Sequence, residues 1–309
     1  MSVHTATLTH RMAVAAPPRQ VFELVADTAG APRFAPSQVH AEIQATDGAS
    51  DLVKRWVYDG RSVRSWLVRR VLRPQDLHIE FTHEAPQPPL AAQRGEWNFV
   101  YRADGGTQVR VTHTVQTAGP AALEAVLSGL DRNVPAQLKT YKFAAELGEG
   151  LQQLSVQHTD SAAVSGTVDQ VVARLSGSPV WAALAAGPAV VRVRQLSDDA
   201  DQVSVAVIDG GAGEASAPPR PTGYVRVRLP GTGVAYKRVD LPAGVHAEVG
   251  SWRVTPDGPG STRVQASSWV TLDAVLTAGP GLAEARAGQH AALAAALRRV
   301  LTTVAAEPG

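Results

Sequence analysis

Two side chains in the first half of the sequence, Arg70 and His113, have the chemistry to stabilise charge and to move protons. Arg70 lies in the segment SWLVRRVLRP, whose apolar residues predict a β-strand. Arginine stays protonated near neutral pH, so it would act as a fixed cation for an enolate or carbonyl oxygen and not as a general base. Histidine has an ordinary pKa of about 6.5 and can both accept and release a proton. The pair would therefore suit a reaction that passes through an enolate.

The predicted strand Val63–Leu72 determines where Arg70 points, because neighbouring side chains of a strand face opposite sides. Trp66, Val68 and Arg70 share one face, and Arg69 belongs to the other. Both faces mix apolar and basic residues, so alternation alone does not show which face is buried. A solvated Arg70, or a salt bridge from Arg70 to an Asp or Glu, is the alternative to a functional cation.

His113 lies in the predicted strand Gln108–Gln116, where the pattern is clearer. It belongs to an apolar stripe, which we expect to face the core. An inward histidine is often a core residue satisfied by its neighbours, so a structural role is the alternative to proton transfer. The other members of the stripe are Val109, Val111 and Val115.

Aromatic residues make up only 5% of the chain, so their positions are informative. Trp66 shares its face with Arg70, and we expect it to line an internal cavity together with Val68. Tyr58 and Trp97 lie on other predicted strands, and we include both among the candidate ligand-binding residues. Core packing is the alternative for both, and it is the stronger alternative for Trp97.

The composition excludes several classes of protein. The net charge of +1 gives no electrostatic basis for binding nucleic acid or an anionic membrane. The absence of cysteine excludes disulfides, thiolate metal sites and a cysteine nucleophile. No signal peptide, membrane-spanning segment, P-loop, dinucleotide-binding fingerprint or metal-binding histidine pair is recognisable. We therefore expect a cytoplasmic protein that uses no metal.

The chain repeats itself once, with a period near 155 residues. GEWNFVYRADGGTQVRVTHTV, residues 95–115, corresponds to GSWRVTPDGPGSTRVQASSWV, residues 250–270. In this correspondence Trp97 matches Trp252. A sequence of 309 residues is comfortable for two domains, and we expect them at residues 1–150 and 151–309.

Each copy predicts the same order of elements: a strand, two short helical segments, six further strands and a long closing helix. Hairpin turns such as Asp59-Gly60 join consecutive strands, so the sheet should be antiparallel. The predicted fold class is α+β, with two tandem modules. In each module a curved antiparallel sheet surrounds a long C-terminal helix and leaves an internal cavity.

The second copy departs from the first at the residues that could do chemistry. Arg226 aligns with Arg70, but the segment GYVRVRLPG has its apolar residues on the opposite face, which predicts an outward Arg226. Ser268 replaces His113, and a Pro-rich loop, Gly213–Gly223, replaces a tight turn. We therefore expect the chemistry in the N-terminal module.

These segments together resemble a known family. The start VAAPPRQVFELVAD, the strand WLVRRV and the segment of residues 95–115 resemble the START/Bet v1-like helix-grip superfamily. Within it, they are most similar to the di-domain aromatase/cyclases of bacterial type II polyketide synthases. The resemblance implies first-ring chemistry on a C9-reduced poly-β-ketone, an aldol closure between C7 and C12 followed by dehydration to an aromatic ring.

The resemblance also implies which residues act. The family's Trp-x-x-x-Arg spacing falls on Trp66 and Arg70, and the histidine that some members use falls on His113. Gln38 occupies the place of a pocket tyrosine found in some members, and we count it among the substrate-binding candidates.

The implied partners are an acyl carrier protein that presents the polyketide on phosphopantetheine, a ketoreductase and a ketosynthase. Aldol closure and dehydration are redox-neutral, so no cofactor is expected. The alternative function is that of a non-catalytic protein of the same fold that binds a lipid or another hydrophobic small ligand, since fold alone does not fix function.

Overall fold

The computed structural model describes residues 3–208, 221–278 and 281–306. The chain divides into two compact units, Met1–Val57 with Arg64–Leu151, and Gln152–Gly309 with the short segment Tyr58–Val63. The boundary expected after residue 150 stays a prediction. In the described part of the chain, no helix is both long and apolar enough to cross a membrane.

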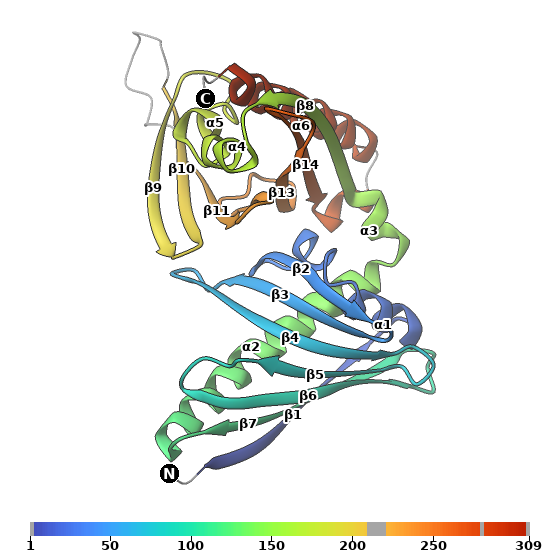
Figure 1. Ribbon diagram of the computed structural model, residues 1–309. Coiled ribbons are helices and arrows are strands. Elements are labelled where there is room, and N and C mark those ends of the chain that lie inside the picture. Colours follow the sequence, from blue (N-terminus) through green and yellow to red (C-terminus); the bar gives the residue numbers. More distant parts are fainter. Residues whose placement is uncertain (1–2, 209–220, 279–280, 307–309) are drawn as a thin grey trace. The chain divides into compact units, whose positions relative to one another are not determined.

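The first unit is a seven-stranded antiparallel sheet with a long helix, α2, across one face (Figure 1). The strand order across the sheet is β1-β7-β6-β5-β4-β3-β2, and β1 pairs with β7. Its elements are β1 (His4–Val14), α1 (Pro18–Ala26), the 3-10 helix η1 (Ala31–Arg33), β2 (Gln38–Asp47), β3 (Ser50–Tyr58), β4 (Val63–Arg73), β5 (His78–Glu84), β6 (Leu90–Tyr101), β7 (Thr107–Thr117) and α2 (Pro120–Leu147).

The second unit repeats this topology, with the strand order β8-β14-β13-β12-β11-β10-β9 and α6 as the long helix. The short helix α3 (Glu149–Leu154) joins the two units. The elements that follow are β8 (Ser155–Ser165), α4 (Val168–Leu175), α5 (Ser178–Ala182), β9 (Ala189–Ser197), β10 (Ala200–Val207), β11 (Thr222–Leu229), β12 (Gly233–Arg238), β13 (Val245–Pro256), β14 (Ser261–Leu272), the 3-10 helix η2 (Ala274–Ala278) and α6 (Leu282–Ala306). The predicted α+β fold with two tandem modules is confirmed.

The closing helix of each unit forms because apolar residues recur at helical spacing and bury one face. In α2 the buried face includes Val134, Leu138 and Tyr141, which pack on the inner face of the sheet. Helix α1 begins at the Pro17-Pro18 pair, where proline lacks only an N–H that a first helical turn leaves unbonded.

The repeat extends to the strand register. In the first unit, the cross-strand partners Leu8, His113, Gly95, Phe81 and Arg70 form one row across five strands. In the second unit the matching row is His158, Ser268, Gly250, Tyr236 and Arg226. Ser268 therefore stands where the first unit has His113, as the sequence predicts.

One position in each row must be glycine. A Cβ on Gly95 would collide with the ring of Phe81, and a Cβ on Gly250 would collide with the ring of Tyr236. Each aromatic ring occupies the space that a side chain at its cross-strand glycine would need.

The interiors of the two units differ in what fills them. The second unit packs four aromatic rings together, with centroids 5.0–5.8 Å apart, and the Tyr236 hydroxyl lies 2.6 Å from Ser268 Oγ. All four side chains are buried, so they occupy the centre of that unit. The four residues are Trp181, Tyr224, Tyr236 and Trp252.

The predicted outward orientation of Arg226 is wrong. Arg226 is buried, and its guanidinium lies 5.5 Å from the centre of the interior Trp181 ring. The prediction failed because both faces of β11 are buried: Val225 and Val227 on one side, and Tyr224 on the other. Alternation of polarity cannot identify the inner face of such a strand. Of the loop Gly213–Gly223, residues 213–220 lie outside the described residues.

Candidate functional site

Arg70 points into the first unit, as the spacing from Trp66 predicts. Only 3% of Arg70 is exposed, and Trp66 and Val68 on the same face of β4 pack in the core. Arg69 lies on the opposite face, where its Nε is 2.7 Å from Glu84 Oε1. The two consecutive arginines therefore have different environments.

The buried guanidinium of Arg70 already has partners within the chain. Its Nε and Nη2 donate to the two carboxylate oxygens of Asp51 at 2.9 and 2.6 Å. Nη2 also donates to the carbonyl of Ala26, and Nη1 donates to that of Val25. These bonds fix the last turn of α1 to the sheet and neutralise the charge of Arg70 locally. The salt bridge that the sequence left open as an alternative is the observed state.

His113 is buried on the inner face of β7, as predicted. Its ring meets the Phe81 ring edge-on at 5.1 Å, and its Nδ1 has no hydrogen-bond partner among the described residues. Burial, with smaller effects from the nearby His10 and His83, lowers the pKa of His113 from 6.5 to about 4. His113 is therefore neutral at pH 7 and can accept a proton.

His83 is a second interior histidine, which the sequence analysis missed. It stacks on Trp66 with parallel rings 6.2 Å apart. Burial, followed by the charge of Arg55, lowers the pKa of His83 to about 4. The alternation of Ile79, Phe81 and His83 with polar residues along β5 is the signal that could have found it.

Arg55 of β3 is also interior, and it too was missed. Its Nη2 donates to Thr28 Oγ1 at 3.3 Å, and its guanidinium is hydrogen-bonded to Tyr141 of α2. Its Nε is buried without a partner among the described residues. The strand segment DLVKRWVY mixes charged and apolar residues on both faces, so its sequence gave no sign that Arg55 is inward.

The structure places Arg70 and His113 in one row but not in contact. They are separated by three strand-to-strand steps, or about 14 Å along the sheet. The Phe81 ring lies between them. A pocket of about 310 Å³ opens at His83 and Gln93, beside this row.

Four predicted ligand-binding residues lie on the inner face of the sheet. Trp66 and Val68 do so on β4, and Trp97 packs against Phe99 and Tyr141 in the core. Gln38 is buried at the start of β2, and its side-chain nitrogen has no partner within the described residues.

Tyr58, which we predict to bind the ligand, does not share the inner face with the other candidates. It has the opposite parity to Arg55 on β3, so it belongs to the other face of the sheet. Its hydroxyl donates to the carbonyl of Gly60 at 2.8 Å and stabilises the β3–β4 turn.

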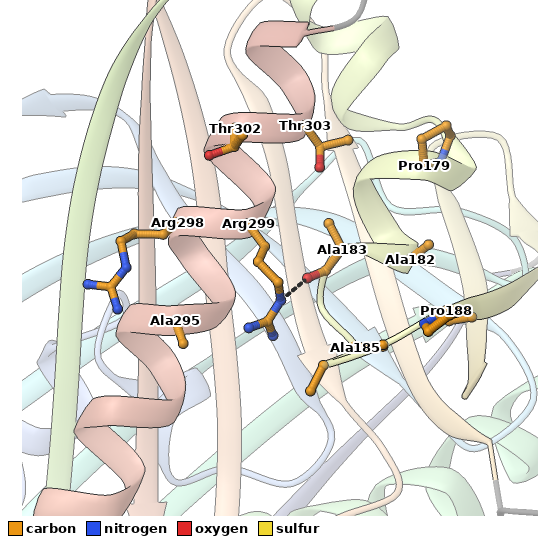
Figure 2. Close-up of a pocket in the computed structure, with 13 residues that line it drawn as sticks. Pro179, Ala182, Ala183, Ala185, Pro188, Ala295, Arg298, Arg299, Thr302 and Thr303 are labelled. Carbon is orange, nitrogen blue, oxygen red and sulfur yellow. Dashed lines mark hydrogen bonds between the residues drawn. The ribbon is translucent and has the colours of Figure 1, made fainter. Parts of the chain in front are cut away.

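A larger pocket, of about 770 Å³, lies in the second unit between α6 and the segment that follows α5 (Figure 2). Arg299 is fixed in its wall by bonds to the carbonyls of Ala183 and Leu184 at 2.9 and 3.1 Å. The lining is mostly alanine, proline and threonine and includes no carboxylate or histidine. Such a wall can bind a ligand but cannot transfer protons. In the described part of the chain no three His, Asp or Glu side chains gather to hold a metal.

The lowered pKa of His113 predicts how stability depends on pH. The unfolded chain binds the proton near pH 6.5 and the folded chain only near pH 4, so the free energy of unfolding falls as the pH drops through this window. The pKa of His113 is about 4 in the folded chain and 6.5 in the unfolded chain. Below both values, protonation of this residue has lowered the free energy of unfolding by about 3 kcal/mol. Urea unfolding of H113Q should show a smaller decline than wild type between about pH 7 and pH 5. Equal slopes for the two proteins would contradict the shift.

Residues 14–140 match the family of polyketide cyclases/dehydrases and lipid transport proteins. The chain is 27% identical, over 97% of its length and 96% of the relative, to the bifunctional cyclase/dehydratase of the actinorhodin polyketide synthase of Streptomyces coelicolor. It is 28% identical to the corresponding granaticin protein of Streptomyces violaceoruber, over 82% of this chain and 78% of that one.

Two solved structures are similar over nearly the whole chain. One is the di-domain ARO/CYC StfQ of the steffimycin pathway, with a TM-score of 0.80, 28% identity and 97% coverage of each chain. The other is the di-domain ARO/CYC BexL of the BE-7585A pathway, with a TM-score of 0.79, 25% identity and coverage of 98% of this chain and 100% of that one.

Proposed function

We propose that this chain, which is similar over nearly its whole length to the di-domain aromatase/cyclases of type II polyketide synthases, is a bifunctional polyketide cyclase and dehydratase. In this proposal it closes the first ring of a C9-reduced poly-β-ketone by an aldol reaction between C7 and C12. It then removes water, and the ring becomes aromatic.

The proposal rests on a difference between the two units: their sheets have the same strand register, but their interiors contain different side chains. The first unit has His113 in its central row, where the second unit has Ser268 bonded to Tyr236. The first unit also has interior His83 and Arg55. Histidines that can transfer protons thus lie in the interior of the N-terminal unit, and this favours that unit as the place of the chemistry.

The proposed role of each residue follows from its charge and its protonation state. Neutral His113 accepts a proton from the carbon that becomes the nucleophile and returns a proton to the leaving hydroxyl. The developing enolate is stabilised by a cation in the same interior, and the family spacing nominates Arg70 for this role. Trp66 and Phe81 supply flat apolar walls against which the growing ring can lie. The reaction as written forms one C–C bond, releases water and needs no oxidant or reductant.

An acyl carrier protein is the proposed partner, because the chain must be presented as a thioester on a flexible arm. A ketoreductase would supply the C9 alcohol, and a ketosynthase would build the chain. Each of these assignments is inferred from the family and from the substrate that the proposed reaction requires.

The test is reconstitution of the reducing synthase with and without this protein. With the full chain present, we expect a C7–C12 cyclised aromatic product, identified by mass spectrometry and NMR. Without it, we expect products of spontaneous closure. The same mixture of products in both reactions would refute the proposed function. If the added protein were only a binder, it would protect the chain without changing the site of closure.

A further inference from the structure

The N-terminal unit has two interior arginines, and their environments differ. Arg70 forms a paired, two-point salt bridge with Asp51, so the two charges cancel. Arg55 has no ion pair with any carboxylate of the described residues, and its hydrogen-bond partners are the hydroxyls of Thr28 and Tyr141. No oxygen of Asp51 bonds Arg55, although that carboxylate lies close enough to raise the pKa of Arg55, so the two arginines share one carboxylate and the three groups carry a net positive charge.

The repeat shows which of these arginines belongs to the scaffold. In the second unit Arg226 pairs with Asp201, with Nε–Oδ2 and Nη2–Oδ2 distances of 2.9 and 2.8 Å, and also donates to the carbonyl of Ser176 at 2.6 Å. This matches the first unit, where Arg70 pairs with Asp51 and donates to carbonyls at the end of α1. Because the pair recurs in a unit whose central row lacks the histidine, it fastens the helix end to the sheet in both units.

Arg55 does not recur. It follows Asp51 by four residues on β3, and the residue four positions after Asp201 on β10 is Val205. Val205 is buried in the core of the second unit. An arginine at this position of the inner face is therefore peculiar to the unit that also has His83 and His113.

A buried charge without a counter-ion is unfavourable unless a ligand or solvent compensates it. The Nε of Arg55 is buried and unpartnered, as are the side-chain nitrogen of Gln38 and the Nδ1 of His113. Gln38 pairs with Val57, which has the same parity as Arg55, so both side chains belong to the inner face. Unsatisfied polar atoms are rare in protein interiors, and a group of them on one face indicates a place that a polar ligand occupies.

The neighbours of Arg55 connect it to the histidines. The guanidinium lies close enough to His83 for its charge to disfavour protonation of that ring, and His83 acts in the same way on His113. A substrate that lies along Trp66 and Phe81 would thus have a fixed cation at one end of the wall and neutral bases along it.

We propose that Arg55 is the catalytic cation that contacts the enolate oxygen of the substrate, and that Arg70 is a positioning residue held by Asp51. The assignment rests on the proposed function. The Nε–H of Arg55 donates to an oxygen on which negative charge develops as a C–H proton leaves for His83, the histidine that lies close enough to feel the charge of Arg55. The same contact would favour the phenolate form of an aromatic product.

The experiment compares R55M with R69M, a matched arginine replacement at a solvent-exposed site. In the reconstituted synthase we expect R55M to lower the rate of cyclised product by about 10²–10³-fold, the effect of losing one oxyanion donor. R69M should be unchanged. R55M breaks no ion pair, so we expect it to remain folded, which urea unfolding measures, and loss of folding would then not explain its defect. R55K, which keeps a charge without the planar fork, should recover part of the rate.

A second readout does not depend on turnover. A hydroxyanthraquinone changes colour on ionisation, and a cation at its oxygen lowers the midpoint of that titration. For the dye bound to R55M, we expect the midpoint to lie about 1 pH unit or more above that for wild type. If R55M cyclises the polyketide as fast as wild type, and the dye bound to R55M titrates at the same midpoint as the dye bound to wild type, Arg55 is not the cation. If wild type itself changes no product, the proposed function fails instead.

Discussion

Replacing Arg70 by methionine is expected to destabilise the N-terminal unit by about 3–5 kcal/mol, because it leaves a buried carboxylate without its partner. Asp51 is 5% exposed, and its two oxygens are bonded to the guanidinium of Arg70. The substitution would also remove the hydrogen bonds that Arg70 donates to the carbonyls of Val25 and Ala26 at the end of α1. Loss of product from R70M would then follow from loss of structure. Urea unfolding followed by tryptophan fluorescence and by circular dichroism measures the effect.

A double variant separates a scaffold from a catalyst. D51L/R70M removes both charges, and replacing a buried pair by apolar residues is often neutral. We expect it to recover most of the stability that R70M loses, and to recover cyclised product with it. If R70M were as stable as wild type and both R70M and D51L/R70M lost the cyclised product, Arg70 would instead act in the chemistry. R226M should destabilise the second unit less than R70M destabilises the first, since Arg228 also bonds Asp201 and would keep that carboxylate paired.

The strand patterns predicted the direction of side chains well where one face was polar. His113 belongs to a stripe of valines, and its inward position follows from the sequence alone. The inward position of Arg70 needed the family spacing from Trp66, because both faces of β4 contain apolar and basic residues. Its partner could not be predicted, since Asp51 is 19 residues away and on another strand. A salt bridge of this kind depends on the sheet register, which alternation within one strand does not specify.

Arg55 and His83 were missed for different physical reasons. The alternation in β5 does place His83 inward, but a histidine between a threonine and a glutamate at the end of a strand is also typical of a solvated strand end. Arg55 is inward because β3 is held in register by Asp51, and its own segment shows no apolar stripe. In the second unit an apolar stripe gave the wrong direction. The valines of β11 predicted that their face is the inner one, although Tyr224 and Arg226 occupy the interior.

The largest catalytic loss is expected at His113. Among the described residues its Nδ1 has no partner within the protein, and the ring is neutral at pH 7 because burial lowers its pKa to about 4. Such a group can take a proton from carbon only if it touches the substrate, and general base catalysis contributes about 10²–10⁴-fold. H113Q keeps a polar side chain of similar size, and we expect it to lower the rate of cyclised product by that factor. H113S, which copies Ser268 of the second unit, should be equally defective.

His83 provides the matched control, because it faces the same interior and has its pKa lowered to about the same value. H83Q should lose less rate than H113Q if His113 is the proton carrier. The pH dependence of the rate gives a further distinction. With His113 as the base, the rate should fall with acid at a pH set by its lowered pKa in wild type, and H113Q should lose this limb of the profile. The reverse ranking of the two glutamine variants would move proton transfer to His83. That result would draw the reacting carbon toward Trp66 and Arg55 and away from Phe81, because His83 stacks on Trp66 and His113 meets Phe81.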